Sequence, residues 1–74
     1  MSVKEAMYNT ALAEFHSQRD KAIATARIYL EHPVGIGEHP QVIDEFIKQI
    51  KIAAESEEAA SMLVDTFRDE IIQE

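Results

Sequence analysis

The feature that most constrains the fold is the distribution of helix-breaking residues. Both prolines and both glycines of this 74-residue chain lie within residues 33–40, and the residues on either side contain neither. Helix-forming residues dominate those flanking stretches. Because a proline removes a backbone donor and disfavours helix in the preceding residue, the first helix should end at Pro33. We therefore predict helices over about residues 3–31 and 40–72, with a turn at 32–40.

The first predicted helix carries an apolar stripe at heptad spacing. Ser2 and Glu5 have the spacing of a capping box, which places the start of the helix. Apolar residues then recur at alternating steps of four and three, with Arg19 in the one charged position and Ile23 and Leu30 widening the stripe. The stripe consists of Tyr8, Leu12, Phe15, Arg19, Ala22, Ala26 and Tyr29.

The second predicted helix has a similar stripe. Pro40 suits the first helical position, and Asp44 and Glu45 follow close to the positive end of the helix dipole. Glu57 occupies the one polar position of the stripe, which Ile43 and Ile47 extend near the turn. Its members are Phe46, Ile50, Ala53, Glu57, Ala60, Val64, Phe67 and Ile71.

Folding the chain about Ile36 brings the two stripes together in an antiparallel hairpin. Ala22 then lies near Ile50 and Leu12 near Ala60, so that large side chains oppose small ones. Arg19 and Glu57 fall within about one helical turn of each other. We predict that they form a polar pair in the core, the alternative being that both side chains extend to solvent from the edge of the stripe.

A second set of apolar residues lies outside both stripes. It consists of Met7, Ala24, Ile28, Ile52, Ala59, Met62 and Ile72. Two helices alone cannot cover both sets, and a 74-residue chain forms one small domain, residues 1–74, with little core. We therefore expect an all-α hairpin that self-associates as a homo-oligomer, a dimer or higher, in a four-helix or larger bundle.

Charge and composition exclude several classes of function. The net charge is −7, so we expect no direct binding to nucleic acid or to anionic membranes. The absence of cysteine excludes disulfides and thiolate metal sites. The sequence has neither an apolar run of about 20 residues nor a signal-peptide pattern, so we expect a soluble protein that is not secreted. Mimicry of nucleic acid by the acidic residues is a further alternative.

The turn gathers most of the residues that could contact a ligand. Its two glycines permit close backbone approach, and it precedes a helix N-terminus, where anions bind favourably. A tight turn in which Val34 and Ile36 close the end of the bundle explains the same residues. The spacing of the histidines and Glu38 matches no familiar zinc pattern, so we expect no metal. The contact candidates are His32, Val34, Gly35, Ile36, Gly37, Glu38 and His39.

We expect neither catalysis nor a cofactor. The chain has no cysteine nucleophile, and no serine sits in a sharp strand-to-helix turn beside a histidine and an acid. Tyr8 and Tyr29 are typical of core packing with the hydroxyl at the rim. In an oligomer they could instead form a shared pocket with Arg19 or Arg27 for a planar anionic ligand.

The sequence of the turn resembles one found in a group of small proteins. The stretch Ala-Arg-Ile-Tyr-Leu-Glu-His-Pro-Val-Gly-Ile-Gly-Glu-His-Pro, residues 26–40, is similar to the interhelical turn of short uncharacterised proteins of tailed bacteriophages. The likeness covers roughly residues 26–58. His32 stands where asparagine is expected and Gln41 where aspartate is expected. The resemblance implies a phage accessory protein in the cytoplasm of an infected bacterium, and it carries over no functional residue.

Three functions are consistent with this pattern. The first is non-enzymatic binding, in which the oligomer engages a host or virion protein through a bundle face or the turn. The second is sequestration of an anionic nucleotide signal of host defence between subunits. The third is a structural role in a larger particle. The first requires exposed apolar patches that survive self-association.

Overall fold

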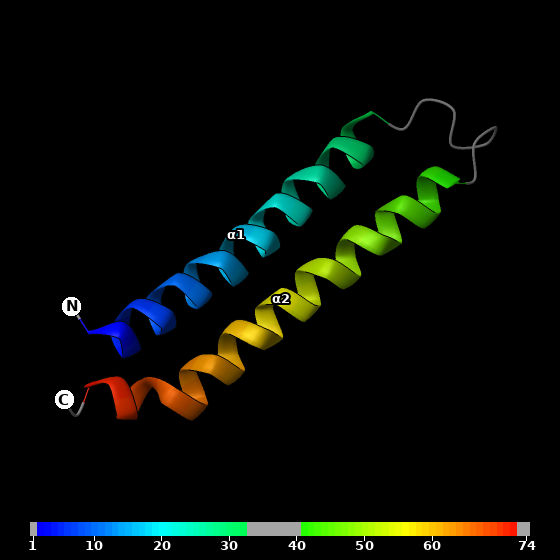
Figure 1. Cartoon of the computed structure of the whole chain (residues 1–74). Coiled ribbons are helices and arrows are strands. Elements are labelled where there is room, and N and C mark those ends of the chain that lie inside the picture. The colour runs from blue at the N-terminus through cyan, green and yellow to red at the C-terminus, as the bar shows by residue number, and fades with distance from the viewer. Residues whose placement is uncertain (1, 33–40, 73–74) are drawn as a thin grey trace.

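The fold is a two-helix antiparallel hairpin (Figure 1). A computed structural model describes residues 2–32 and 41–72, in which α1 spans Val3–Glu31 and α2 spans Gln41–Ile72. The two helices pack along their length, and the molecule measures 56 × 18 × 14 Å. The predicted helical hairpin is therefore confirmed. We call the end where α1 begins and α2 finishes the open end, and the opposite end the turn end.

Local sequence fixes both ends of α1. The backbone N–H of Glu5 donates to Ser2 Oγ at 3.1 Å, and the Glu5 carboxylate accepts from the backbone N–H of Ser2 at 3.4 Å. This is the predicted capping box, which satisfies donors that the first turn would leave unpaired. At the other end, His32 leaves helical geometry with φ −128° and ψ 68°, and its N–H donates to Ile28 O.

The contact face of α1 follows the predicted stripe. All seven of its members are buried or half-buried, and the two most enclosed are Ala22 and Ala26. The widening residues do not share this burial: Ile23 is 38% and Leu30 66% exposed. Heptad spacing therefore identified the face that α1 turns toward α2, but it overestimated its width.

The contact face of α2 differs from the predicted stripe. Ser56 and Ala60 are its buried residues, and Gln49 is half-buried. Ile50, Glu57 and Phe67 were predicted to lie in this face, and all three are exposed. Ile43 and Ile47, which were predicted to extend the stripe near the turn, are exposed as well. After Phe46, the residues of α2 that face α1 are Gln49, Ala53 and Ser56. The predicted series was Ile50, Ala53 and Glu57. Both series have heptad spacing, and the observed one places smaller side chains against α1.

Small residues therefore form the centre of the interface. Ala22, Ala26, Ser56 and Ala60 are the four buried residues of the described chain, and all are small. Their size lets the two backbones approach closely, but it limits the apolar area that the hairpin buries. Among the described residues, the large apolar side chains are at best half-buried.

The second apolar set divides into two groups. Ile52 and Ala59, predicted to lie outside the contact, are half-buried beside it. The remaining members are exposed, and these are Met7, Ala24, Ile28, Met62 and Ile72. Both discrepancies in α2 have the same cause, because its contact face is rotated toward Ile52 and Ala59 and away from Ile50 and Glu57.

Candidate binding surfaces

An apolar groove lies between the helices at the open end. Its volume is about 350 Å³. Met7 is 70% and Phe67 44% exposed, so large apolar side chains of its wall face solvent. We call this site the open-end groove, and its lining residues are Lys4, Met7, Tyr8, Ala11, Leu63, Phe67, Glu70 and Ile71.

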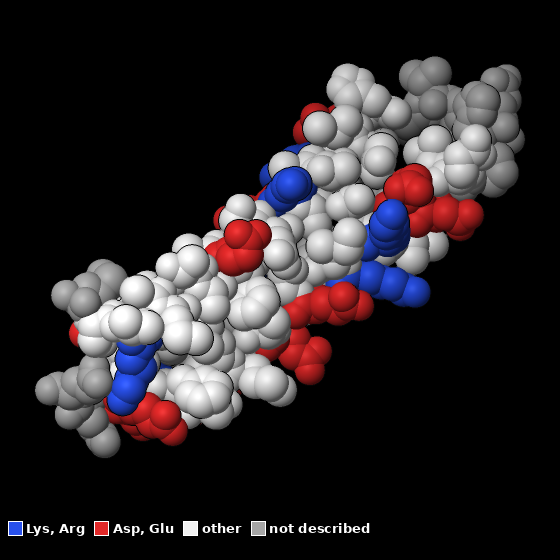
Figure 2. Space-filling model, viewed as in Figure 1, with Lys and Arg blue, Asp and Glu red and all other residues white. Residues whose placement is uncertain are grey.

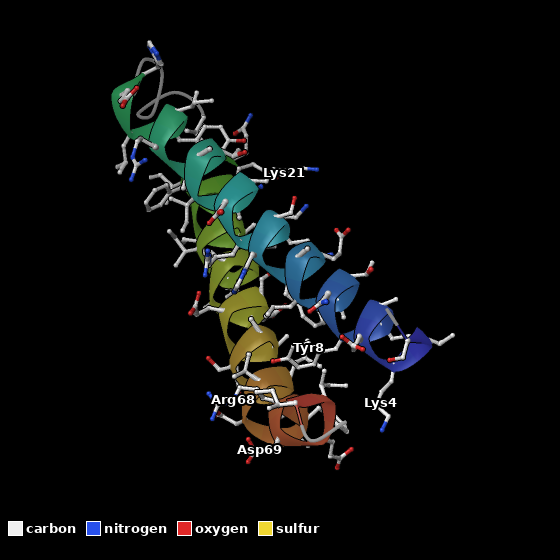
Figure 3. All side chains as sticks on the ribbon, turned by 90° about the vertical axis from the view of Figure 1, so that its left-hand side faces the viewer. Lys4, Tyr8, Lys21, Arg68 and Asp69 are labelled. Atoms are coloured by element: carbon white, nitrogen blue, oxygen red, sulfur yellow. The ribbon has the colours of Figure 1, made fainter. Side chains whose placement is uncertain are left out.

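The helical repeat explains the composition of this groove. Met7 and Ala11 are four residues apart, as are Leu63 and Phe67, so each pair lies on one helix face. Figure 3 shows Tyr8 between the two helices near their ends. Lys4 and Glu70 add one charge of each sign to the lining. A flexible methionine beside aromatic rings is typical of surfaces that adapt to apolar side chains of a partner.

A second apolar surface lies on one flank of the turn half of the hairpin. We call it the isoleucine flank, and it consists of Ile23, Leu30, Ile43, Ile47 and Ile50, which are 38–66% exposed. On α1 its members are seven residues apart, and on α2 they follow the spacing four and three. Each set therefore lies on one face of its helix.

Two hollows place both halves of the isoleucine flank on the same side of the hairpin. Leu30 and Ile43 line one of about 240 Å³ at the turn end. His16 and Glu57 line another of about 180 Å³ farther toward the open end. Ile23 and Ile50 lie one heptad from His16 and Glu57 toward the turn end, so they continue the same flank.

Arg19 joins the two helices near the middle of the hairpin. Its Nη1 donates to Glu57 Oε2 at 2.7 Å, and its Nε donates to Asp20 Oδ1 at 2.9 Å. The hydrogen bond to Asp20 and then that to Glu57 raise the pKa of the guanidinium above its ordinary value. The Arg19 side chain is 27% and the Glu57 side chain 57% exposed. The pair thus forms at the solvent edge of the interface, combining the two predicted alternatives.

The predicted ligand-pocket residues do not converge within the chain. Tyr8 lies in the open-end groove and Tyr29 lines the hollow at the turn end, about 30 Å away along the same helix. Arg27 is exposed, and Arg19 is already hydrogen-bonded to two carboxylates. A pocket built from all four residues is therefore absent from a single hairpin.

Most of the predicted turn candidates lie outside the described residues. These are Val34, Gly35, Ile36, Gly37, Glu38 and His39. Of the candidates, His32 alone is described, and it is exposed at the end of α1. Within residues 2–32 and 41–72, no group of three histidine or acidic side chains could hold a metal ion.

Charge is distributed unequally between the helices. α1 carries four acidic and four basic residues, whereas α2 carries eight acidic against three basic, a net charge of −5. Figure 2 views the side to which Lys21 points in Figure 3, and it shows charged side chains along the edges of an uncharged strip. Arg68 points to the opposite side of the hairpin.

Comparison with known proteins gives no match: no family model fits the chain, and no curated protein or solved structure is significantly similar to it. The resemblance to bacteriophage proteins therefore stays a prediction. Neither described helix contains an apolar segment long enough to cross a bilayer. The surfaces of the hairpin therefore provide the basis for a functional proposal.

Sequence reasoning did not identify the open-end groove. It placed Phe67 in the helix–helix contact and Met7 in a separate set, although the two line one site. Heptad spacing identifies faces, but it does not reveal where two helices leave a hollow between them. The available signal was local: Met7, Ala11, Leu63 and Phe67 form apolar pairs four residues apart at the same end of the hairpin.

Proposed function

We propose that the chain acts by non-enzymatic binding, as a homo-oligomeric helical hairpin that engages another protein. The observation that best supports this proposal is the large exposed surface of the chain. The chain exposes 5610 Å², whereas a compact monomer of its 8.4 kDa mass exposes roughly 4600 Å². The excess, roughly 1000 Å², resembles the area that one partner buries in a standard protein interface.

Two sites hold most of the exposed large apolar side chains, which supports two separate contacts. The isoleucine flank is aliphatic, and it suits packing against another helix pair. The open-end groove has a volume of about 350 Å³, enough for large side chains. We assign self-association to the isoleucine flank and the partner protein to the groove.

The charge of α2 indicates what kind of partner fits the groove. Four of the lining residues, Leu63, Phe67, Glu70 and Ile71, come from α2, the helix with net charge −5. A helix with apolar anchors and flanking basic residues would complement both properties. A host or virion protein in an infected bacterium is the class that the turn resemblance favours. Nucleotide sequestration has less support, because two carboxylates already occupy Arg19.

Substitution in the groove tests partner binding. Met7→Glu places a charge in the apolar wall, and because Met7 is 70% exposed, the hairpin should keep its fold. We expect tagged Met7→Glu protein to lose a bacterial or phage protein that the wild type retains, as measured by quantitative mass spectrometry. Calorimetry with that purified protein should then show an affinity at least about tenfold weaker, a loss of about 1.4 kcal/mol.

Ser17→Glu is the matched control, because Ser17 is exposed on α1 outside the groove and receives the same charge. It should bind like the wild type. Equal weakening by both substitutions would show that added charge, rather than the groove, determines binding. Equal binding by all three proteins would exclude the groove as the partner site.

A further inference from the structure

We infer that two copies of the chain associate through the isoleucine flank with their turn ends together, so that α1 of each copy packs against α2 of the other. This inference rests on the proposed self-association and specifies its geometry. Two hairpins arranged in this way form a four-helix bundle in which every neighbouring pair of helices is antiparallel.

α1 leaves part of an apolar stripe on α2 uncovered. Ile43, Ile50, Val64 and Ile71 recur at multiples of seven residues, the spacing of a helix–helix contact. Yet Ile43 and Ile50 are 46% and 47% exposed, and Ile47 beside them is 46% exposed. The sequence thus provides a second contact stripe on α2, and within the described chain α1 covers only the half toward the open end.

The two flanks of the hairpin differ in polarity. The isoleucine flank has five large aliphatic side chains on neighbouring turns. On the opposite flank, the seven-residue series from Met7 runs through Glu14 and Lys21 and ends at a single large aliphatic residue, Ile28. The corresponding series from Met62 on α2 runs through Glu55 and Lys48 to Gln41. Desolvating those four charged side chains is costly. The isoleucine flank is therefore the less costly one to bury against a second copy.

Symmetry determines which parts of the two flanks meet. A twofold axis can relate two hairpins packed flank to flank in two ways, one with the turn ends together and the other with them at opposite ends. The isoleucine flank occupies only the turn half of the hairpin. With the turn ends together, the two isoleucine flanks meet each other. In the opposite arrangement each would face the open half of the second copy, where His16 and Glu57 lie.

Charge favours the same arrangement independently. With the turn ends together, each α2, of net charge −5, faces α1 of the second copy, whose acids and bases balance. With the turn ends apart, α2 faces α2, and two strongly acidic helices lie side by side. Like charges at that distance are destabilising, and the penalty increases at low salt.

Distances between spin labels test the arrangement in the otherwise unaltered chain. The sequence contains no cysteine, so Glu31→Cys and Val3→Cys each provide one exposed labelling site, at the turn end and the open end. With turn ends together, two labels at residue 31 lie roughly 20 Å apart, across one bundle. With turn ends apart, they lie roughly 40 Å apart, the length of α1. In a mixture of the two labelled chains, the distance from residue 31 of one copy to residue 3 of the other should be roughly 40 Å with turn ends together and roughly 20 Å with turn ends apart.

Sedimentation separates the two levels of the proposal. A monomer at micromolar concentration would overturn both self-association and the inferred geometry. A dimer with the residue-31 labels roughly 40 Å apart would overturn the geometry alone.

Substitution on each flank tests the same inference without labels. Ile50→Glu should raise the dimer Kd at least about 100-fold, because the twofold interface would bury one added carboxylate from each copy. Met62→Glu, on the opposite flank and 64% exposed, should leave it within about threefold. The reverse outcome would place the interface on the other flank. Helical circular dichroism identifies a variant that fails to fold, and in that case the label distances alone decide.

Discussion

At the scale of single residues, Arg19 has the most specific role in the hairpin. It is the charged member of the α1 contact face, and it reaches Glu57 of α2 while also bonding its neighbour Asp20. A guanidinium is charged at every ordinary pH, and the hydrogen bonds to Asp20 and Glu57 raise the pKa of Arg19 further. Its contribution would be lost only as the pH rises through that raised value, in strongly alkaline solution.

The first residue-level prediction concerns this pair. A double-mutant cycle of Arg19→Ala and Glu57→Ala should give a favourable coupling in urea unfolding, because the two residues meet only when the helices pack. The coupling should shrink in about 1 M salt, where screening is strong. The Arg19–Asp20 cycle is the control, and it should give a smaller coupling because neighbouring residues already lie close in the unfolded chain. The opposite ranking would show that Glu57 does not anchor α2.

At the scale of helices, the limits of sequence prediction are clear in α2. The hairpin and the contact face of α1 follow from breakers and heptad spacing. In α2 two series, through Ile50 and Glu57 or through Gln49 and Ser56, fit the same spacing. Hydrophobicity favours Ile50 over Gln49, whereas close approach of the backbones favours the small Ser56 over Glu57. The choice between two series of equal spacing therefore depends on the distance between the helices, which the spacing of apolar residues does not reveal.

The prediction at this scale tests the small-residue interface. Ala26→Leu should lower the free energy of unfolding by about 1–3 kcal/mol, because Ala26 is only 4% exposed and the added atoms must separate the helices. Ala24→Leu makes the same change at an exposed position of α1 and should stay within about 0.5 kcal/mol of the wild type. Chemical denaturation of both variants measures the difference. Equal effects would mean that close approach of the helices contributes little to stability.

At the scale of the whole molecule, shape and stability are linked. The radius of gyration is 16.7 Å, whereas a compact chain of this length has one of roughly 11 Å. Such an elongated hairpin buries little apolar surface, and its buried residues, Ala22, Ala26, Ser56 and Ala60, contribute few carbon atoms each. Because the chain has no cysteine, no disulfide offsets this small core, and we propose that association supplies much of the stability. On this proposal, the residues that the hairpin leaves exposed form the contact between copies.

Dependence of stability on protein concentration is the final prediction. If folding and dimer formation are coupled, a 100-fold increase in protein concentration stabilises the dimer by about 2.7 kcal/mol and raises its Tm. Thermal unfolding followed by circular dichroism measures this shift. Ile50→Glu should reduce it, because the substitution removes the isoleucine flank from association. Met7→Glu should preserve it, because the open-end groove lies outside that contact. A Tm independent of concentration in the wild type would show instead that the elongated hairpin is stable alone, and that both apolar surfaces are available to other proteins.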